Sequence, residues 1–226
     1  MAIPTQLSRR SFLKGAGLAA GASLLPATPS WASPDEERQR LARLFHYMGK
    51  RYGVDPLILM AIAEVESQRH LWTLNVDWEP FFLETKSAAL ATARTALARR
   101  WLLRSERQGE PHRSFWPTKP QAHRAARRLG LRSPTIRAIT ENNVDIGIMQ
   151  ISWRYHGDRV PGLSRLLDED YNIAYGAWYL RRLAERHGMD AAIGVYHAGA
   201  SPEREARRRE YQAKVFAARA RLLEEV

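Results

Sequence analysis

The sequence predicts a mainly helical fold of the α+β class, in which helices surround one buried helix and a small α+β element is inserted. Apolar residues recur at helical spacing near both ends of the chain. Residues 57–63 are apolar without a break, which is typical of a helix that is buried nearly all round. The chain has 226 residues, of which 45% are hydrophobic, and this is enough for one domain with a substantial core.

Residues 1–32 have the features of an export signal. The pair Arg9-Arg10 is followed by a short apolar run at 15–25 and by small residues in Ser30-Trp31-Ala32. A basic start, an apolar middle and a small-residue exit are typical of a signal peptide, and the paired arginines resemble a twin-arginine signal. The run is too short to span a bilayer. We therefore expect a periplasmic mature chain of residues 33–226 without a transmembrane span.

The first two helices of the mature chain have clear boundaries. Acidic residues follow Ser33, and a helix is predicted from there to about Tyr52, where Gly53 ends it. Asp55 is a good N-cap for a second helix over 56–68, because proline follows at the first helical position. This second helix is the apolar one and is therefore expected to be central.

Two carboxylates, Glu64 and Glu66, stand at the end of this central helix. Residues two apart on a helix point about 200° away from each other, so only one of them can face a given cleft. The spacing does not say which one does. Burial disfavours a charged carboxylate, so a glutamate in such a place is paired, exposed or held protonated for acid chemistry.

Residues 71–141 are treated as the inserted α+β element. The segments 72–76 and 81–84 predict a β-hairpin. After it we expect a helix at 87–104, a proline-containing loop at 108–120, a short helix at 121–129, and a strand or short helix at 135–140. The aromatic residues of this element are expected to pack rather than to bind a ligand: Trp72, Trp78, Phe81, Phe82, Trp101 and Trp116.

The last part of the chain returns to helices. Gly147 stands directly before the alternating stretch Ile148-Met149-Gln150-Ile151. Three further helices are predicted at 171–186, 190–199 and 204–225, the last of them charged and amphipathic.

Composition excludes several classes of function. The chain has no cysteine, which rules out disulfides and thiolate metal sites. Its histidines show no metal-ligand spacing, so neither a metal nor a cofactor is expected. The net charge of +11 comes mostly from arginines spread through several helices. Because no nucleic-acid motif accompanies it, we interpret it as a surface that faces the cell envelope. A serine hydrolase would need a Gly-x-Ser-x-Gly elbow, which is missing.

The remaining candidates suit the cleavage of a glycan. Breaking a glycosidic bond needs a protonated acid, and a glutamate at the edge of an apolar helix can hold its proton. A site that binds sugar rings also needs flat apolar surfaces and hydrogen-bonding groups. The chain offers such groups at Met149, Gln150, Tyr179, Tyr196 and His197. Taken singly, each has an ordinary explanation, because a buried tyrosine or methionine is usually core and a glutamine after an apolar run usually belongs to a turn.

Taken in order, these residues form a recognisable set. The set comprises Glu66-Ser67, Gly147-Ile148-Met149-Gln150-Ile151, Asn172-Ile173 with Gly176 and Tyr179-Leu180, and Tyr196-His197-Ala198-Gly199. It resembles the four motifs of the soluble lytic transglycosylase (SLT) domain family, which has a goose-lysozyme-like fold. Tyr211, Lys214 and Val215 resemble its closing helix. The resemblance covers about 41–70 and 142–220, and it implies a lysozyme-like helical domain.

This resemblance implies both a reaction and a site. Glu66 is the expected catalytic acid, and the expected substrate is the bond between N-acetylmuramic acid (MurNAc) and N-acetylglucosamine (GlcNAc) in peptidoglycan glycan strands. The same glutamate then acts as a base while a 1,6-anhydro ring forms, without water. Ser67 is expected to orient Glu66. The residues expected to bind the substrate are Ser67, Met149, Gln150, Tyr179, Tyr196 and His197.

The chain departs from the family pattern at His197, where the family usually has asparagine, and in the length of the insertion before Gly147. Asp145 is interpreted as a structural residue of the turn before Gly147. Two alternatives stay open. One is a muramidase that hydrolyses the same bond, for which Asp145 would be the tempting second carboxylate. The other is a non-catalytic factor that binds or assembles at the wall.

A finer resemblance concerns possible partners. Asp145-Ile146-Gly147 and Trp72-Thr73-Leu74-Asn75 resemble the subgroup associated with conjugation and type IV secretion. This implies local opening of peptidoglycan for an envelope-spanning machine, with secretion or conjugation proteins as partners.

Overall fold

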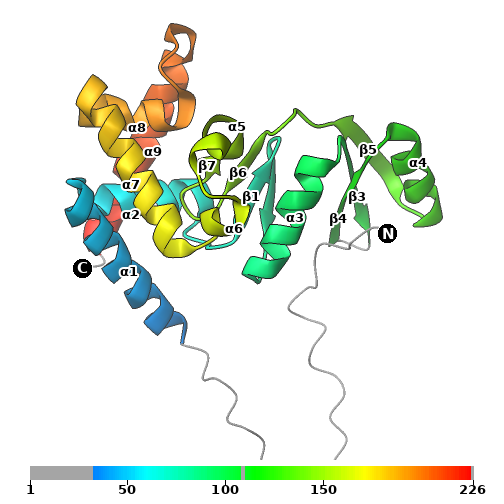
Figure 1. Cartoon of the computed structure of the whole chain (residues 1–226), viewed down its shortest axis with the longest axis horizontal. Coiled ribbons are helices and arrows are strands. Elements are labelled where there is room, and N and C mark those ends of the chain that lie inside the picture. Colours follow the sequence, from blue (N-terminus) through cyan, green and yellow to red (C-terminus); the bar gives the residue numbers. More distant parts are fainter. Residues whose placement is uncertain (1–32, 108–109, 225–226) are drawn as a thin grey trace, which may run out of the picture.

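The computed structural model describes residues 33–107 and 110–224, and the predicted signal peptide at 1–32 lies outside them. The fold is mainly helical, as predicted, and it contains two small antiparallel sheets (Figure 1). Within the described residues, no helix combines the length and the apolar character needed to cross a membrane. The helices are α1 (Pro34–Tyr52), α2 (Pro56–Ser67), α3 (Lys86–Ala98), α4 (Lys119–Arg128), α5 (Trp153–His156), α6 (Leu163–Leu166), α7 (Glu169–His187), α8 (Met189–Ala198) and α9 (Glu205–Glu224), with 3-10 turns η1 (Gly157–Arg159) and η2 (Pro202–Arg204).

Capping residues set the boundaries of α1 and α2. Ser33 and Glu36 form a reciprocal capping box at the start of α1, and Gly53 ends that helix in the left-handed conformation. The Asp55 carboxylate accepts a hydrogen bond from the Leu57 backbone N–H at 2.9 Å. It also accepts hydrogen bonds from Arg219 on α9, at 2.9 and 3.0 Å, so the start of α2 is tied to the last helix of the chain.

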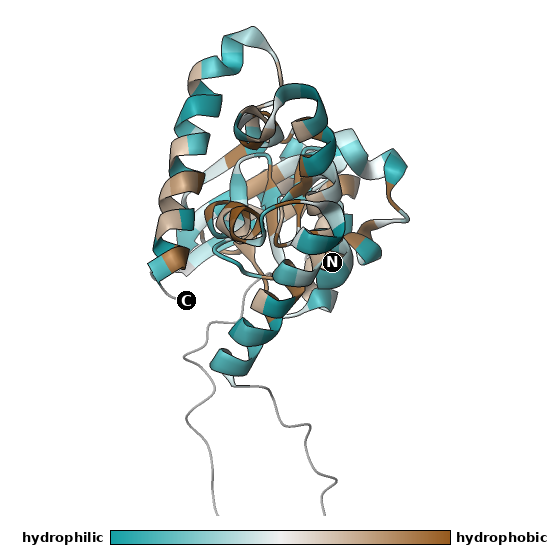
Figure 2. Ribbon diagram, turned by 90° about the vertical axis from the view of Figure 1, so that its left-hand side faces the viewer, coloured by the Kyte–Doolittle hydropathy of each residue, from teal (hydrophilic) through white to brown (hydrophobic). Residues whose placement is uncertain are grey.

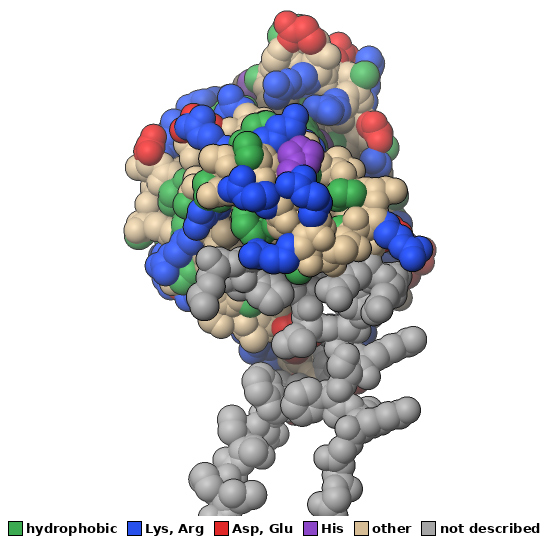
Figure 3. Space-filling view, turned by 90° about the vertical axis from the view of Figure 1, so that its right-hand side faces the viewer, with side chains coloured by type: hydrophobic (Ala, Val, Ile, Leu, Met, Phe, Trp, Pro, Cys, Tyr) green, Lys and Arg blue, Asp and Glu red, His purple; other side chains and the backbone are tan. Residues whose placement is uncertain are grey.

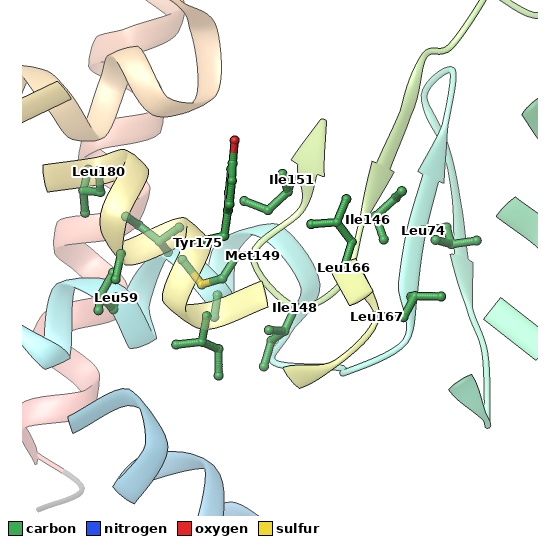
Figure 4. Close-up of a cluster of buried hydrophobic side chains, with 14 of the residues drawn as sticks. Leu59, Leu74, Ile146, Ile148, Met149, Ile151, Leu166, Leu167, Tyr175 and Leu180 are labelled. Atoms are coloured by element: carbon green, nitrogen blue, oxygen red, sulfur yellow. The ribbon is translucent and has the colours of Figure 1, made fainter. Parts of the chain in front are cut away.

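The helix α2 is central, as predicted. It packs against both α1 and α9, and most of its apolar residues are fully or nearly buried. Hydrophobic residues gather in the middle of the molecule, while the outer helices carry hydrophilic ones (Figure 2). Residues of α2, α7 and the neighbouring sheet form one continuous apolar cluster (Figure 4). Burial of this cluster is the main stabilising contribution to the fold.

The strands form two sheets. In the first, of order β2-β1-β6-β7, the predicted hairpin of β1 (Thr73–Val76) and β2 (Glu79–Phe82) is extended by β6 (Val144–Ile146) and β7 (Ile151–Ser152). In the second, of order β4-β3-β5, the strands are β3 (Trp101–Arg107), β4 (Glu110–Trp116) and β5 (Arg132–Ala138). The buried Glu79 links the two sheets, because it pairs with Arg113 of β4 at 2.5 Å and with Arg104 of β3 at 3.4 Å.

Two expectations for the inserted element were wrong. The helix predicted at 87–104 ends at Ala98, and the loop predicted at 108–120 contains β4. The reason lies in β3, whose successive residues face two different cores. Leu102 packs into the main cluster, and Leu103 packs with the alanines of α4, so both are buried without showing an alternating pattern. Pro111 is compatible with β4 because that strand lies at an edge of the sheet.

The turn at 147–150 is held by a buried asparagine of α7. Asn172 accepts a hydrogen bond from Met149 N at 2.8 Å and donates to the carbonyl oxygens of Ile146 and Leu166 at 2.9 and 2.8 Å. Gly147 has φ +79° and lies directly against this side chain, since a Cβ atom added there would be 2.4 Å from Asn172 Nδ2. The turn therefore needs glycine both for its backbone conformation and for space.

We predict that Gly147→Ala lowers the free energy of unfolding by about 3 kcal/mol, because it adds a steric clash to an unfavourable φ. Gly130→Ala is the matched control: Gly130 also has a positive φ, +62°, but nothing lies within 4 Å of an added Cβ. The control should lose only about 1 kcal/mol. Urea denaturation of both variants measures the difference, and equal losses would contradict the close packing of Asn172.

Candidate active site

Glu66 lies on the last turn of α2, where α8 and α9 meet it. Its Oε1 atom accepts a hydrogen bond of 2.7 Å from the Tyr211 hydroxyl of α9. His197 Nδ1 of α8 lies 3.2 Å from the same oxygen. The Glu66 side chain is 14% exposed, so it is largely shielded while still open to a ligand. The fold thus brings two side chains to the Glu66 carboxylate that are separated from it by 131 and 145 positions in the sequence.

Both partners of Glu66 hold each other in place. The rings of His197 and Tyr211 are stacked, with centroids 4.3 Å apart and planes 5° from parallel. Burial and the charge of Glu66 raise the pKa of Tyr211 well above its usual value, so its hydroxyl stays a donor. A histidine where the family usually has asparagine therefore still supplies a polar nitrogen to the glutamate.

The structure shows which glutamate of α2 faces the helices α8 and α9. Glu64 is paired with Arg69, with Nε and Oε2 2.7 Å apart. Glu66 instead points toward the residues of α8 and α9. Sequence spacing left this choice open, because it could not show which side of α2 the rest of the chain would leave accessible.

Ser67 and Gln150 shape the turn at 147–150. The buried Ser67 hydroxyl contacts the carbonyl oxygens of Ala63 and Ile148 at 2.9 and 2.8 Å. Gln150 has φ +47°, and its side-chain amide donates to the carbonyl oxygens of Thr73 and Gly147 at 3.1 and 2.7 Å. Both contacts of the Ser67 hydroxyl thus go to backbone oxygens.

Met149 lies beneath this turn. Its side chain is 0% exposed and sits against Gly176 of α7, where an added Cβ would come within 2.9 Å of it. Tyr196 donates a hydrogen bond of 2.7 Å to the Met149 carbonyl oxygen. The buried Met149 side chain therefore packs the 147–150 turn against α7 and offers no surface to a sugar ring in this structure.

An aromatic row continues from the turn. The half-buried rings of Tyr179 and Tyr196 are 5.5 Å apart. Tyr179 also packs edge-on against His156, with centroids 4.6 Å apart, and His156 Nδ1 lies 3.0 Å from the Tyr175 hydroxyl. Burial lowers the pKa of His156, which favours its neutral form. Sequence reasoning did not select His156, because nothing in its local pattern separates it from the other histidines.

The comparison with protein families identifies the segment that supplies most of this site. Residues 130–217 match the model of the Transglycosylase SLT domain. This segment is similar to an SLT domain and covers 88 of the 226 residues. The SLT domain family consists of lytic transglycosylases that act on peptidoglycan, and the presence of this lysozyme-like domain implies that activity. Residues 6–26 match the signal sequence of the twin-arginine translocation pathway, so the chain is exported, as predicted.

No curated protein and no solved structure matches the chain. The SLT match begins at residue 130 and therefore includes His197 and Tyr211 but not Glu66. The contacts of Glu66 with both residues join the central helix α2 to the SLT segment.

Asp145 lies on β6 next to this site. Burial raises its pKa to about 6; a hydrogen bond from Ser152 opposes the shift, the charge of Glu66 adds to it, and His197 reduces it. The contact with Ser152 agrees with the structural role expected from the sequence. The influence of Glu66 and His197 shows in addition that a second carboxylate belongs to the electrostatic surroundings of the SLT site.

Trp78 departs from the expectation that the aromatic residues of the insertion pack. It is 71% exposed in the turn between β1 and β2, and Phe82 is exposed as well, whereas the other four are fully or partly buried. Arg207 of α9 lies over the Trp78 ring, 5.5 Å from its centroid. Arg207 is one helical turn before Tyr211. Trp78 therefore lies beside α9, the helix whose Tyr211 contacts Glu66.

The backbone around Trp78 is held in an unusual conformation. Asp77 and Trp78 have φ of +50° and +71°. The Asp77 carboxylate is paired with Arg137 of β5 and accepts a hydrogen bond from Asn143 at 3.0 Å. Trp78 N donates to Asn75 Oδ1 at 2.9 Å. Strain of this kind persists where surrounding contacts fix it and is common at functional sites.

In the described part of the chain, no group of three or more histidine, aspartate or glutamate side chains could hold a metal ion.

We predict that Asp145→Asn stabilises the protein at pH 7.5 but has little effect at pH 4. The folded-state pKa of about 6 lies above the usual 3.8, so the native state binds its proton more tightly than the unfolded state. Stability is then lost as the pH rises through about 6, and asparagine avoids this loss. We expect a gain of up to about 3 kcal/mol at pH 7.5 in urea denaturation. An equal effect at both pH values would contradict the shifted pKa.

Proposed function

We propose that the enzyme cleaves the β-1,4 bond between MurNAc and GlcNAc and leaves a 1,6-anhydro-MurNAc end. The observation that carries this proposal is the pair of contacts that Glu66 makes with His197 and Tyr211. Both partners lie in the SLT segment, which does not include Glu66 itself. Glu66 is thus the group through which that segment can act as an acid.

One glutamate can carry both proton transfers. Protonated Glu66 gives its proton to the glycosidic oxygen as the bond to the MurNAc C1 atom breaks, so GlcNAc leaves as an alcohol. The Glu66 carboxylate then takes the proton of the MurNAc 6-hydroxyl, whose oxygen bonds to C1 and closes the 1,6-anhydro ring. Atoms balance without water, and Glu66 ends protonated, ready for the next strand.

The neighbours of Glu66 have different proposed roles. Tyr211 and His197 orient the carboxyl group. Gln150, Tyr179 and Tyr196 line the sugar subsites together with His197, since they are only partly buried. The expected substrate-binding residues Ser67 and Met149 act through the backbone of the 147–150 turn, which their buried side chains support.

Glu66→Gln should abolish release of anhydro-muropeptides from purified peptidoglycan, because glutamine cannot supply the proton. We expect a loss of at least about a thousandfold, measured by mass spectrometry of the products. Glu64→Gln is the matched control on the same helix and should keep nearly full activity, since Glu64 pairs with Arg69. Anhydro products from the Glu66→Gln protein would refute the proposal.

A second candidate function, hydrolysis of the same bond, is favoured by one observation. The pKa of Asp145 is raised mainly by burial and in part by the charge of Glu66, so a second carboxyl group lies near Glu66. A hydrolase that activates water uses two carboxyl groups. The same digestion separates the two reactions, because hydrolysis gives reducing ends heavier by one water. If such products dominate and disappear with Asp145→Asn, the enzyme is a muramidase.

We also propose that Trp78 extends the glycan-binding surface. An exposed indole ring beside α9 offers a flat apolar face on which a sugar can stack, and its strained turn keeps it outward. Trp78→Ala should raise KM for long glycan strands by about fivefold with little change in kcat. Tyr47→Ala removes an exposed ring on α1 and serves as the control. A loss of kcat alone would contradict a binding role.

We further propose that the enzyme opens the wall locally for an envelope-spanning conjugation or secretion system. This rests on the resemblance of 72–75 and 145–147 to that subgroup. In cells, the Glu66→Gln protein should then fail to support transfer by the system while growth stays normal. Unchanged transfer would contradict this role.

A further inference from the structure

We infer that a cavity in the inserted element binds the stem peptides of peptidoglycan through their free carboxylates. This inference rests on the proposed function, because it assumes that peptidoglycan is the substrate. It assigns a second binding site to the protein, separate from Glu66.

The cavity lies between α3, β4 and α4 and has a volume of about 580 Å³. Pockets for small ligands typically have about 300–1,000 Å³, so a short peptide segment fits. In Figure 1 the strands β6 and β1 lie between α2, which carries Glu66, and the end of the molecule that contains β4 and α4. The lining combines arginines with aromatic and small polar residues: Ala91, Thr92, Thr95, Arg99, Ser114, Phe115, Trp116, Pro117, Gln121, Arg124, Ala125, Arg127 and Arg128.

The charge of the cavity is positive and uncompensated. Its lining has four arginines and no acidic residue, and none of these arginines has an ion pair among the described residues. Residues 86–140 as a whole contain thirteen arginines and lysines against two acidic residues, a net charge of +11. Basic side chains accordingly dominate this end of the surface (Figure 3). Guanidinium groups in such a setting favour carboxylates or phosphates.

Two further groups favour a peptide over a simple anion. Gln121 Oε1 is shielded from solvent and has no hydrogen-bond partner in the described part of the chain, so it can accept a bond from an amide N–H. Trp116 is fixed by a hydrogen bond of 2.9 Å from its Nε1 to Ser114 Oγ, which presents its ring as an apolar wall. A stem peptide offers all three matching features: carboxylates, amide N–H groups and aliphatic side chains. Phosphate would use the arginines alone.

The inference is tested by titration calorimetry of the purified protein with a free stem tetrapeptide. The same peptide with its carboxylates amidated should bind at least about tenfold more weakly, because charge-assisted hydrogen bonds are lost. The triple variant Arg99→Gln, Arg124→Gln, Arg128→Gln should also bind the free peptide at least about tenfold more weakly. Thermal melts check that it is folded.

A charge-matched control replaces three exposed arginines outside the inserted element: Arg43→Gln, Arg182→Gln and Arg221→Gln. It should bind within about twofold of the unchanged protein, because these arginines lie elsewhere on the surface. Equal binding of the amidated peptide, an equal loss in the control, or absence of peptide binding would overturn the inference. So would tighter binding of anionic phospholipid vesicles that displaces the peptide.

Cleavage of peptide-free glycan strands, measured on the same preparation, reports on the proposed function alone. Strands cleaved to anhydro ends without peptide binding would refute the second site and leave the proposed function standing. Peptide binding without any cleavage would refute the proposed reaction.

Discussion

The site depends on one buried amide. Asn172 uses its side chain to hold the turn at 147–150, the end of β6 and the end of α6 at once. A buried amide left unpaired is costly, so these partners are fixed together or not at all. Through the Met149 carbonyl the same turn accepts the Tyr196 hydroxyl, and through the Ile148 carbonyl it meets Ser67. The positions of Glu66 and of the aromatic row follow from this single packing arrangement.

The contacts of the Glu66 carboxylate come from distant parts of the chain. The α2 helix supplies Glu66, while α8 and α9 supply its two partners. The Asp55 ion pair with Arg219 adds a second tie between α2 and α9, at the opposite end of α2. Because both ends of α2 are tied to one helix, the Glu66 carboxylate cannot shift along the axis of α2 without breaking one of these contacts. Such preorganisation is what proton transfer at a fixed oxygen requires.

Much of the fold was predictable because local signals determine it. Ser33, Gly53 and Asp55 act as caps wherever the chain goes, and the boundaries of α1 and α2 followed from them. Strand β3 was missed because Leu102 and Leu103 serve two cores, which removes the alternation that identifies a strand. The choice of Glu66 over Glu64 and the exposure of Trp78 depend on contacts with α9, more than a hundred residues away, which no local pattern contains.

Residues 86–140 carry a net charge of +11, which equals that of the whole chain, so the remaining residues have equal numbers of acidic and basic side chains. The molecule is therefore electrically lopsided along its long axis (Figure 1). In the field of an anionic polymer such a body feels a torque as well as an attraction. The α4 end turns toward the polymer, so the molecule keeps a preferred orientation while it diffuses along a negatively charged mesh.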